Sequence, residues 1–140
     1  MLVPGLVSVT LRNLPPEQVL DIAARAGLRA IEWGGDVHVP PGDLDRAIRV
    51  RKETQRVGLV VSSYGSYYRL GSGEPAIPCF ESVIRTARAL GAPLVRVWAG
   101  AKGSAATSAK ERAAIVAEAR ELLSMCQAAR TGLAFEFHEN

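Results

Sequence analysis

Histidine and cysteine are scarce in this sequence of 140 residues, which contains two of each. Cys79 and Cys126 are far apart, form no C-x-x-C pair and have no histidine at a spacing that zinc sites use. This scarcity excludes a zinc finger or a related cysteine-bound metal. Both cysteines fall on helix faces that the hydrophobic pattern predicts to be buried, where an unpaired cysteine packs as a small apolar side chain.

Long apolar runs are also missing. No stretch approaches the ~20 consecutive apolar residues of a membrane-spanning helix. Residues 1–5 lack the basic start and the apolar core of a signal peptide. We therefore expect a cytoplasmic protein without membrane contact. The sequence does contain 48% hydrophobic and 22% charged residues, which is typical of one globular domain over residues 1–140.

The charge balance is basic, with a net charge of +3, so the distribution of the charges decides whether an anionic partner is expected. The densest basic run, residues 46–56, is mixed with acidic residues and contains no aromatic side chain on which a base could stack. A solvated outer helix face explains such a run better. We expect no nucleic acid partner.

A repeated pattern gives the strongest structural signal: a helix-like segment ends in glycine and an apolar strand follows. The glycines recur at intervals of about 30 to 40 residues, the length of a strand-helix unit. Glycine suits the position after a helix because the backbone there turns left-handed. The predicted strands are residues 6–11, 28–33, 59–64, 94–98 and 133–137, and the predicted helices are residues 15–26, 43–57, 80–90 and 108–126.

The predicted helices each carry an apolar stripe on one side, as helices that cover a sheet do. The third keeps this spacing without a miss from residue 80 to residue 90. The fourth begins with Ser108 and Glu111, which have the spacing of a capping box. The stripes predicted for the first two helices consist of Val19, Ile22, Ala23 and Ala26, and of Leu44, Ala47 and Ile48.

The order βαβαβαβαβ predicts an α/β fold with five parallel strands and four helices. A (β/α)8 TIM barrel has about 250 residues, so the chain would be the N-terminal portion of one. The alternative is a flavodoxin-like open parallel sheet, which normally carries a helix after its last strand and a phosphate-binding loop or acidic cluster after an early one. The sequence shows neither feature, and we favour the partial barrel.

Three segments, residues 8–17, 26–33 and 133–138, resemble the xylose isomerase-like TIM barrels. This superfamily comprises sugar and sugar-phosphate isomerases and epimerases, inositol catabolic enzymes and the endonuclease IV branch. The likeness covers the whole chain but only the N-terminal half of the family fold. It implies a divalent metal ion, manganese, magnesium, cobalt or zinc, with a strand-five glutamate as ligand and acid/base group. Here that residue is Glu136, and the later ligands are expected beyond Asn140.

Glu136 is the principal candidate for catalysis and for metal binding. It lies between Phe135 and Phe137 in an apolar strand, and a parallel strand is usually buried on both faces. A buried carboxylate is destabilising unless it is paired, metal-bound or protonated, and these states also serve proton transfer beside a carbonyl. A structural ion pair is the alternative.

Two further polar residues lie near strand ends. His138 is expected on the same side of its strand as Glu136, where it either contacts substrate or is satisfied by nearby carboxylates. Glu32, near the end of the second strand, either lines a substrate pocket or pairs with Arg96 or Arg29.

Aromatic side chains near the ends of the third and fourth strands are candidates for binding a sugar. The rings predicted to face the substrate are those of Tyr64, Tyr67, Tyr68 and Trp98, because rings suit the apolar faces of a sugar. Packing in the core is the alternative. His38, in the loop after the second strand, is a further candidate for substrate binding, with exposure to solvent as the alternative. Arg12 and Arg69 either bind a phosphate or lie on the surface.

Together these features predict a sugar or sugar-phosphate isomerase or epimerase that moves a proton next to a carbonyl with the help of a metal. Its small-molecule substrate would be a sugar or a polyol. One alternative is an endonuclease IV-like metallohydrolase. Another is a non-catalytic half-barrel that assembles with a partner, or with itself as a homo-oligomer, through exposed strand edges.

Overall fold

A computed structural model describes residues 2–71 and 79–136. Its strands are β1 (Gly5–Val7), β2 (Ala30–Gly34), β3 (Val60–Arg69), β4 (Leu94–Trp98) and β5 (Gly132–Glu136). Its helices are α1 (Pro16–Arg25), α2 (Leu44–Arg56), α3 (Phe80–Leu90) and α4 (Ala109–Ala128), with two short 3-10 helices, η1 (Ser8–Leu11) and η2 (Ser104–Ala106). Among the described residues, no helix is both long enough and apolar enough to cross a membrane.

The five strands form one parallel sheet in the order β1-β2-β3-β4-β5. Each strand pairs with the next one along the chain, whereas a flavodoxin-like sheet has the order 2-1-3-4-5. The sequential order is that of a TIM barrel, so the predicted partial barrel is confirmed and the open-sheet alternative is wrong. β1 and β5 are the edges of the described sheet, and assembly through these edges stays a prediction.

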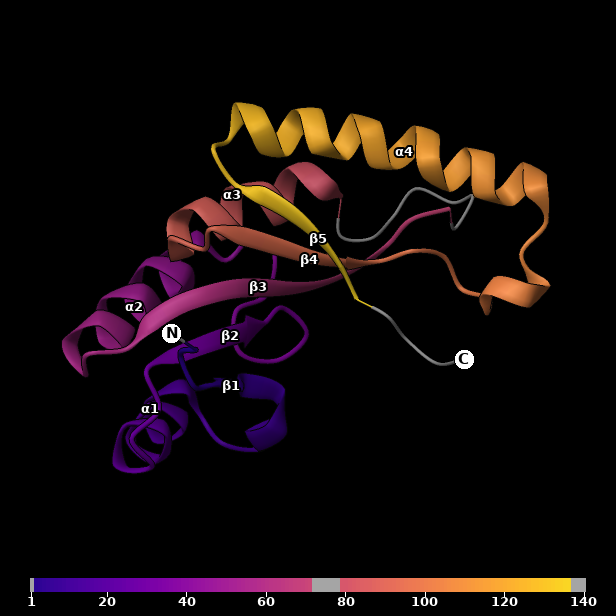
Figure 1. The fold of residues 1–140 in the computed structure, drawn as a ribbon. Helices are drawn as coiled ribbons and strands as arrows, with labels where there is room; N and C mark the ends of the chain where they lie inside the picture. The colour runs from indigo at the N-terminus through magenta and orange to yellow at the C-terminus, as the bar shows by residue number, and fades with distance from the viewer. Residues whose placement is uncertain (1, 72–78, 137–140) are drawn as a thin grey trace.

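The hydrophobic core lies between the sheet and the four helices, which cover one side of it (Figure 1). Val95 and Val97 of β4 point into this core and are buried. Because side chains alternate along a strand, Arg96 and Trp98 of β4 face the opposite side, which we call the inner face. The stripe predicted for α3 is confirmed, with these residues buried: Phe80, Val83, Ile84, Ala87 and Leu90.

The buried faces predicted for α1 and α2 are partly wrong. Ile22 and Ile48 are 41% and 42% exposed, and Ala26 lies just beyond the end of α1. The residues that these helices bury are Pro16, Val19, Leu20 and Ala23 in α1 and Ala47, Val50 and Thr54 in α2. A helix that packs on a sheet buries a narrow stripe, so an apolar residue at its flank stays exposed.

One of the two cysteines also departs from its predicted burial. Cys126 is buried in α4 as expected, but Cys79 is exposed. Cys79 is the residue that precedes α3, so it lies outside the helix and away from its apolar stripe.

The first predicted strand is too long and the third is too short. The chain leaves the sheet after Val7 and forms η1, where the Ser8 hydroxyl accepts a hydrogen bond from the Gly34 backbone N–H at 2.9 Å. This contact turns the chain toward the loop after β2. β3 instead continues to Arg69, with an irregular register between Gly65 and Arg69.

The predicted capping box at the start of α4 is confirmed. The Ser108 hydroxyl accepts from the Glu111 backbone N–H at 3.3 Å, and the Glu111 carboxylate accepts from the Ser108 backbone N–H at 2.8 Å. Two N–H groups that the first turn leaves without helical partners are therefore satisfied.

Replacing Ser108 by alanine is expected to lower the free energy of unfolding by about 1 kcal/mol, because the Glu111 N–H loses its acceptor. Urea unfolding followed by circular dichroism measures the change. Ser124→Ala, the same exchange at an exposed position inside α4, is the control. It should leave the free energy unchanged or raise it slightly, since alanine favours helix. Equal losses in both variants would contradict the capping role.

Candidate functional site

Three charged side chains meet on the inner face of the sheet: Glu32 from β2, Arg96 from β4 and Glu136 from β5. Arg96 Nε donates to Glu32 Oε1 at 2.9 Å, and Nη2 lies 2.9 Å from the same oxygen. Arg96 Nη1 donates to Glu136 Oε2. One guanidinium therefore links two carboxylates from different strands, and we call these three residues the carboxylate-arginine cluster.

The link between Arg96 and Glu32 crosses β3 at Gly65. Gly65 is paired with Arg96 in the sheet, and a Cβ at this position would lie 2.7 Å from Arg96 Nη2 and 3.0 Å from Glu32 Oε1. Glycine therefore lets the two side chains meet over the strand. Ser63 donates to Glu32 Oε2 at 2.6 Å, so both oxygens of Glu32 are bonded. Of the two predicted roles of Glu32, the structure shows the ion pair with Arg96.

Glu136 is the member of the cluster that a ligand can reach. Its side chain is 35% exposed, compared with 12% for Glu32. The indole Nε1 of Trp98 and Nη1 of Arg96 both donate to Oε2, while no described residue donates to Oε1. The two donors orient the carboxylate and leave one oxygen for another partner.

Tyr67 forms an aromatic wall beside the cluster. Its backbone is left-handed, with a φ of 60°, in the irregular part of β3, a conformation that is strained for tyrosine. The ring stands edge-on to Trp98, with 5.1 Å between centroids, and Arg96 Cζ lies 5.9 Å from its centroid. Desolvation by burial raises the pKa of the Tyr67 hydroxyl. Tyr67 is one of the three tyrosines predicted to face the substrate, whereas Tyr68 is buried. The irregular backbone that places Tyr67 here is not visible in the alternation of residue types.

A cavity of about 360 Å³ lies next to Glu136, at the carboxyl ends of β3, β4 and β5. Trp98 and Glu136 form its wall on the sheet side, and the loop after β4 together with the start of α4 forms the opposite side. This is the end of the strands at which TIM barrels carry their active sites. The charged residues that line it, besides Glu136, are Arg69, Lys102 and Arg112.

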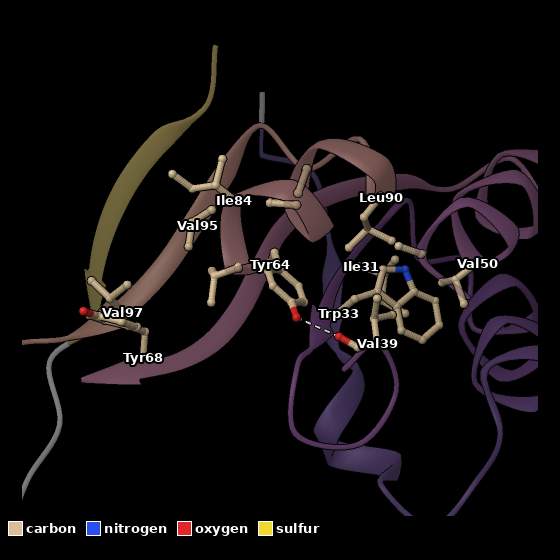
Figure 2. Close-up of a cluster of buried hydrophobic side chains, with 14 of the residues drawn as sticks. Ile31, Trp33, Val39, Val50, Tyr64, Tyr68, Ile84, Leu90, Val95 and Val97 are labelled. Atoms are coloured by element: carbon tan, nitrogen blue, oxygen red, sulfur yellow. Dashed lines mark hydrogen bonds between the residues drawn. The ribbon is translucent and has the colours of Figure 1, made fainter. Parts of the chain in front are cut away.

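Tyr64 and His38 lie in the core and not at the cavity. Tyr64 is fully buried and its hydroxyl donates to the Val39 carbonyl at 2.7 Å (Figure 2). His38 is 1% exposed. Neither ring offers a surface to a ligand in this structure, so we leave both out of the proposed site. His138 lies outside the described residues, and its contact with substrate stays a prediction.

His38 anchors the segment that follows β1. Its Nε2 lies 3.0 Å from the Leu14 carbonyl oxygen and its Nδ1 lies 2.9 Å from the Ser8 hydroxyl. Because a carbonyl only accepts, Nε2 carries the proton and Nδ1 accepts from Ser8. Desolvation by burial lowers the pKa of His38, although the Leu14 carbonyl and the charge of Asp36 act in the opposite direction.

The described residues do not by themselves form a metal site. Within residues 2–71 and 79–136, no group of three or more histidine, cysteine, aspartate or glutamate side chains is placed to hold an ion. Both carboxylates of the cluster are already bonded to Arg96. A metal at Glu136 would need ligands from beyond these residues.

Comparison with known proteins agrees with the geometry of the sheet. A sequence profile of the xylose isomerase-like TIM barrels matches residues 20–140. The chain belongs to this family. No curated protein sequence matches it significantly.

Several solved structures superpose on nearly the whole chain. The probable 3-DHS dehydratase AsbF from Bacillus anthracis has a TM-score of 0.84 at 19% identity, over 99% of this chain and 53% of that one. A D-allulose 3-epimerase from Methylomonas sp. has a TM-score of 0.72 at 20% identity, over 99% of this chain and 52% of that one. The IOLI protein with a bound zinc atom has a TM-score of 0.73 at 16% identity, over 97% of this chain and 51% of that one. The chain thus spans about half the length of these structures.

Replacing Arg96 by methionine is expected to lower the free energy of unfolding by about 2 kcal/mol at neutral pH, because two carboxylates lose their counter-charge on a partly buried face. Adding Glu32→Gln should recover part of this loss, since one unpaired charge is removed. Denaturant titration measures both variants. Arg29→Met, at an exposed position, is the matched control. A loss in R96M no larger than in R29M would contradict the pairing.

The lowered pKa of His38 predicts a loss of stability on mild acidification. Below the unfolded-state pKa of about 6.5, the unfolded chain binds a proton that the folded chain excludes. The free energy of unfolding should therefore fall as the pH drops from about 6.5 toward the folded pKa, by at most about 1.4 kcal/mol per pH unit. Denaturation midpoints measured across this range test it. His38→Gln should remove this slope, and an unchanged slope in H38Q would refute the assignment.

Proposed function

We propose that the chain is the N-terminal half of a sugar or sugar-phosphate isomerase or epimerase in which Glu136 moves a proton at the carbon next to a carbonyl. The observation that carries the proposal is the position of Glu136: a partly exposed carboxylate at the carboxyl end of β5, oriented by two N–H donors and facing a cavity. The substrate class is a small sugar or polyol.

The described residues support this chemistry in distinct ways. The Glu136 carboxylate takes the proton from the C–H bond, leaving an enediolate, and in an isomerisation it returns the proton to the neighbouring carbon on the same face. Epimerisation would need a second acid to protonate the opposite face of the same carbon. Arg96 and Trp98 hold the carboxylate in place through Oε2. Trp98 and Tyr67 offer aromatic surface to the apolar face of a sugar.

The comparisons support the reaction class and the involvement of a metal without fixing either for this chain. One solved structure of the same fold is a D-allulose 3-epimerase, and another contains a zinc atom. A divalent metal, manganese, magnesium, cobalt or zinc, would polarise the oxygen atoms of the substrate. Glu136 would be one ligand and the described residues supply no complete set, so the proton transfer above is derived from the protein side chains alone.

The alternatives have less support. A metallohydrolase acting on DNA would need a basic surface long enough to follow the nucleic acid backbone. The densest basic run instead lies on α2, on the helix-covered side of the sheet, whereas Glu136 lies on the inner face. A non-catalytic half-barrel is separated from an enzyme by the following experiment.

Glu136→Gln is expected to abolish proton exchange with solvent. The 140-residue chain is incubated in heavy water with manganese and a panel of ketoses and ketose phosphates, and deuterium at the carbon next to the carbonyl is followed by NMR. Removing the carboxylate that takes the proton should slow incorporation by at least about 100-fold.

The matched control is Glu121→Gln, the same exchange on the exposed surface of α4. It should exchange at the wild-type rate. Wild-type incorporation that persists in E136Q would overturn the role of Glu136. No incorporation by the wild-type chain on any member of the panel would overturn the catalytic proposal for this chain and favour the non-catalytic half-barrel.

A further inference from the structure

The cavity beside Glu136 carries an excess of positive charge. Its lining contains three cationic side chains, Arg69, Lys102 and Arg112, against the single carboxylate of Glu136. Like charges repel when they line one small space, so such a set is favourable only if an anion or a neighbouring carboxylate compensates it. What the cavity can bind therefore depends on which of the three cations already has a carboxylate partner.

Lys102 is compensated within the protein. Its ammonium lies 2.6 Å from the Glu111 carboxylate. The hydrogen bonds from Lys102 and from Ser108 lower the pKa of Glu111 to about 2, which keeps it ionised at neutral pH. This pair leaves the charge of Arg69 and Arg112 to be balanced by something else.

Arg69 and Arg112 have no carboxylate partner among the described residues. Arg69 lies with its Cζ 4.7 Å from the centroid of the Trp98 ring, and its one hydrogen bond, to the Gly100 carbonyl, is long at 3.5 Å. Arg112 donates to the carbonyl and to the hydroxyl of Ser104, both of which are neutral. Arg12, the other arginine considered for an anion, differs in being paired with Asp36 at 2.9 Å.

The arrangement of Arg69 is that of an anion-binding arginine. Contact with the Trp98 ring restrains the Arg69 guanidinium, and its N–H groups that face away from the ring remain able to donate. A guanidinium so fixed can bind two oxygens of a phosphate or a carboxylate at once. Arg69 is partly buried in this cavity, which Ile115 and Val116 also line, and an ionic bond to a partly buried group is stronger than one in open solvent.

We propose that this cavity binds an oxyanion group, a phosphate or a carboxylate, between Arg69 and Arg112. One consequence of this inference rests on the proposed function. The substrate would be an anionic sugar or polyol whose acid group lies at the two arginines and whose reacting carbon lies at Glu136. A neutral sugar would leave both guanidinium groups without a carboxylate partner among the described residues.

Binding is tested by NMR on the isotope-labelled 140-residue chain at constant ionic strength, with inorganic phosphate in one arm and acetate in the other. The chain has two tryptophans, so the two indole N–H signals act as probe and internal control. Trp98 lines the cavity, whereas Trp33 is fully buried and bonded to Thr54. The Trp98 signal should shift saturably and the Trp33 signal should stay in place. The arm that gives the tighter binding identifies the acid group.

Arg69→Met and Arg112→Met should each weaken binding by about tenfold, since each removes charged donors. Arg120→Met, an exposed arginine on α4 outside this cavity, should bind as the wild type does. An unchanged Trp33 signal in each variant shows that the chain is folded. The proposal is overturned if neither anion shifts the Trp98 signal saturably, or if R69M and R112M both bind with wild-type affinity.

Glu136→Gln separates this inference from the proposed function. It removes a negative charge from the cavity, so phosphate should bind at least as tightly as to the wild type, although deuterium exchange is lost. Anion binding without any exchange in the wild-type chain would leave the oxyanion site standing and overturn the proposed function. Exchange on neutral ketoses without anion binding would leave the proposed function standing and overturn the oxyanion site.

Discussion

The guanidinium of Arg96 is the interaction on which the inner face of the sheet depends. Two strands bring Glu32 and Glu136 to this face, where like charges repel and lose part of their solvation. A planar group with several donors compensates both, because different nitrogen atoms bond the two carboxylates. The absence of a side chain at Gly65 keeps the space over β3 clear for this contact. The orientation of Glu136, and with it the candidate site, follows from this arrangement.

Hydrophobic packing on the other side of the sheet sets the position of these polar groups. Val95 and Val97 are buried beneath the helices, so Arg96 and Trp98, their neighbours in β4, face the inner side. A shift of one residue in the pairing of β4 would exchange the two sets and bury a guanidinium among apolar side chains. Packing in the core therefore fixes the register of β4, and this register sets the positions of Arg96 and Trp98 in the candidate site.

The parts of this structure that sequence predicted correctly depend on near neighbours along the chain. The apolar spacing of α3 and the capping box at Ser108 are set within a few residues. Glu136 was a candidate on similarly local grounds, as a carboxylate in an apolar strand, and its catalytic role stays a prediction. The errors arise from contacts between distant segments. Ser8 leaves the first strand for a bond with Gly34, and the space at Gly65 has meaning only once β2 and β4 lie on either side of it. One sequence does not show which segments lie side by side.

The sequential order of the strands bears on how the chain is assembled. Each pairing joins segments about 30 residues apart, so the entropy lost in closing each loop stays nearly the same from one unit to the next. Synthesis delivers the units in the order in which they pair, and a strand can dock as soon as its own helix has left the ribosome. A sheet of this kind grows at one edge by repeating a single step, and in a complete barrel this growth ends when the last strand meets the first.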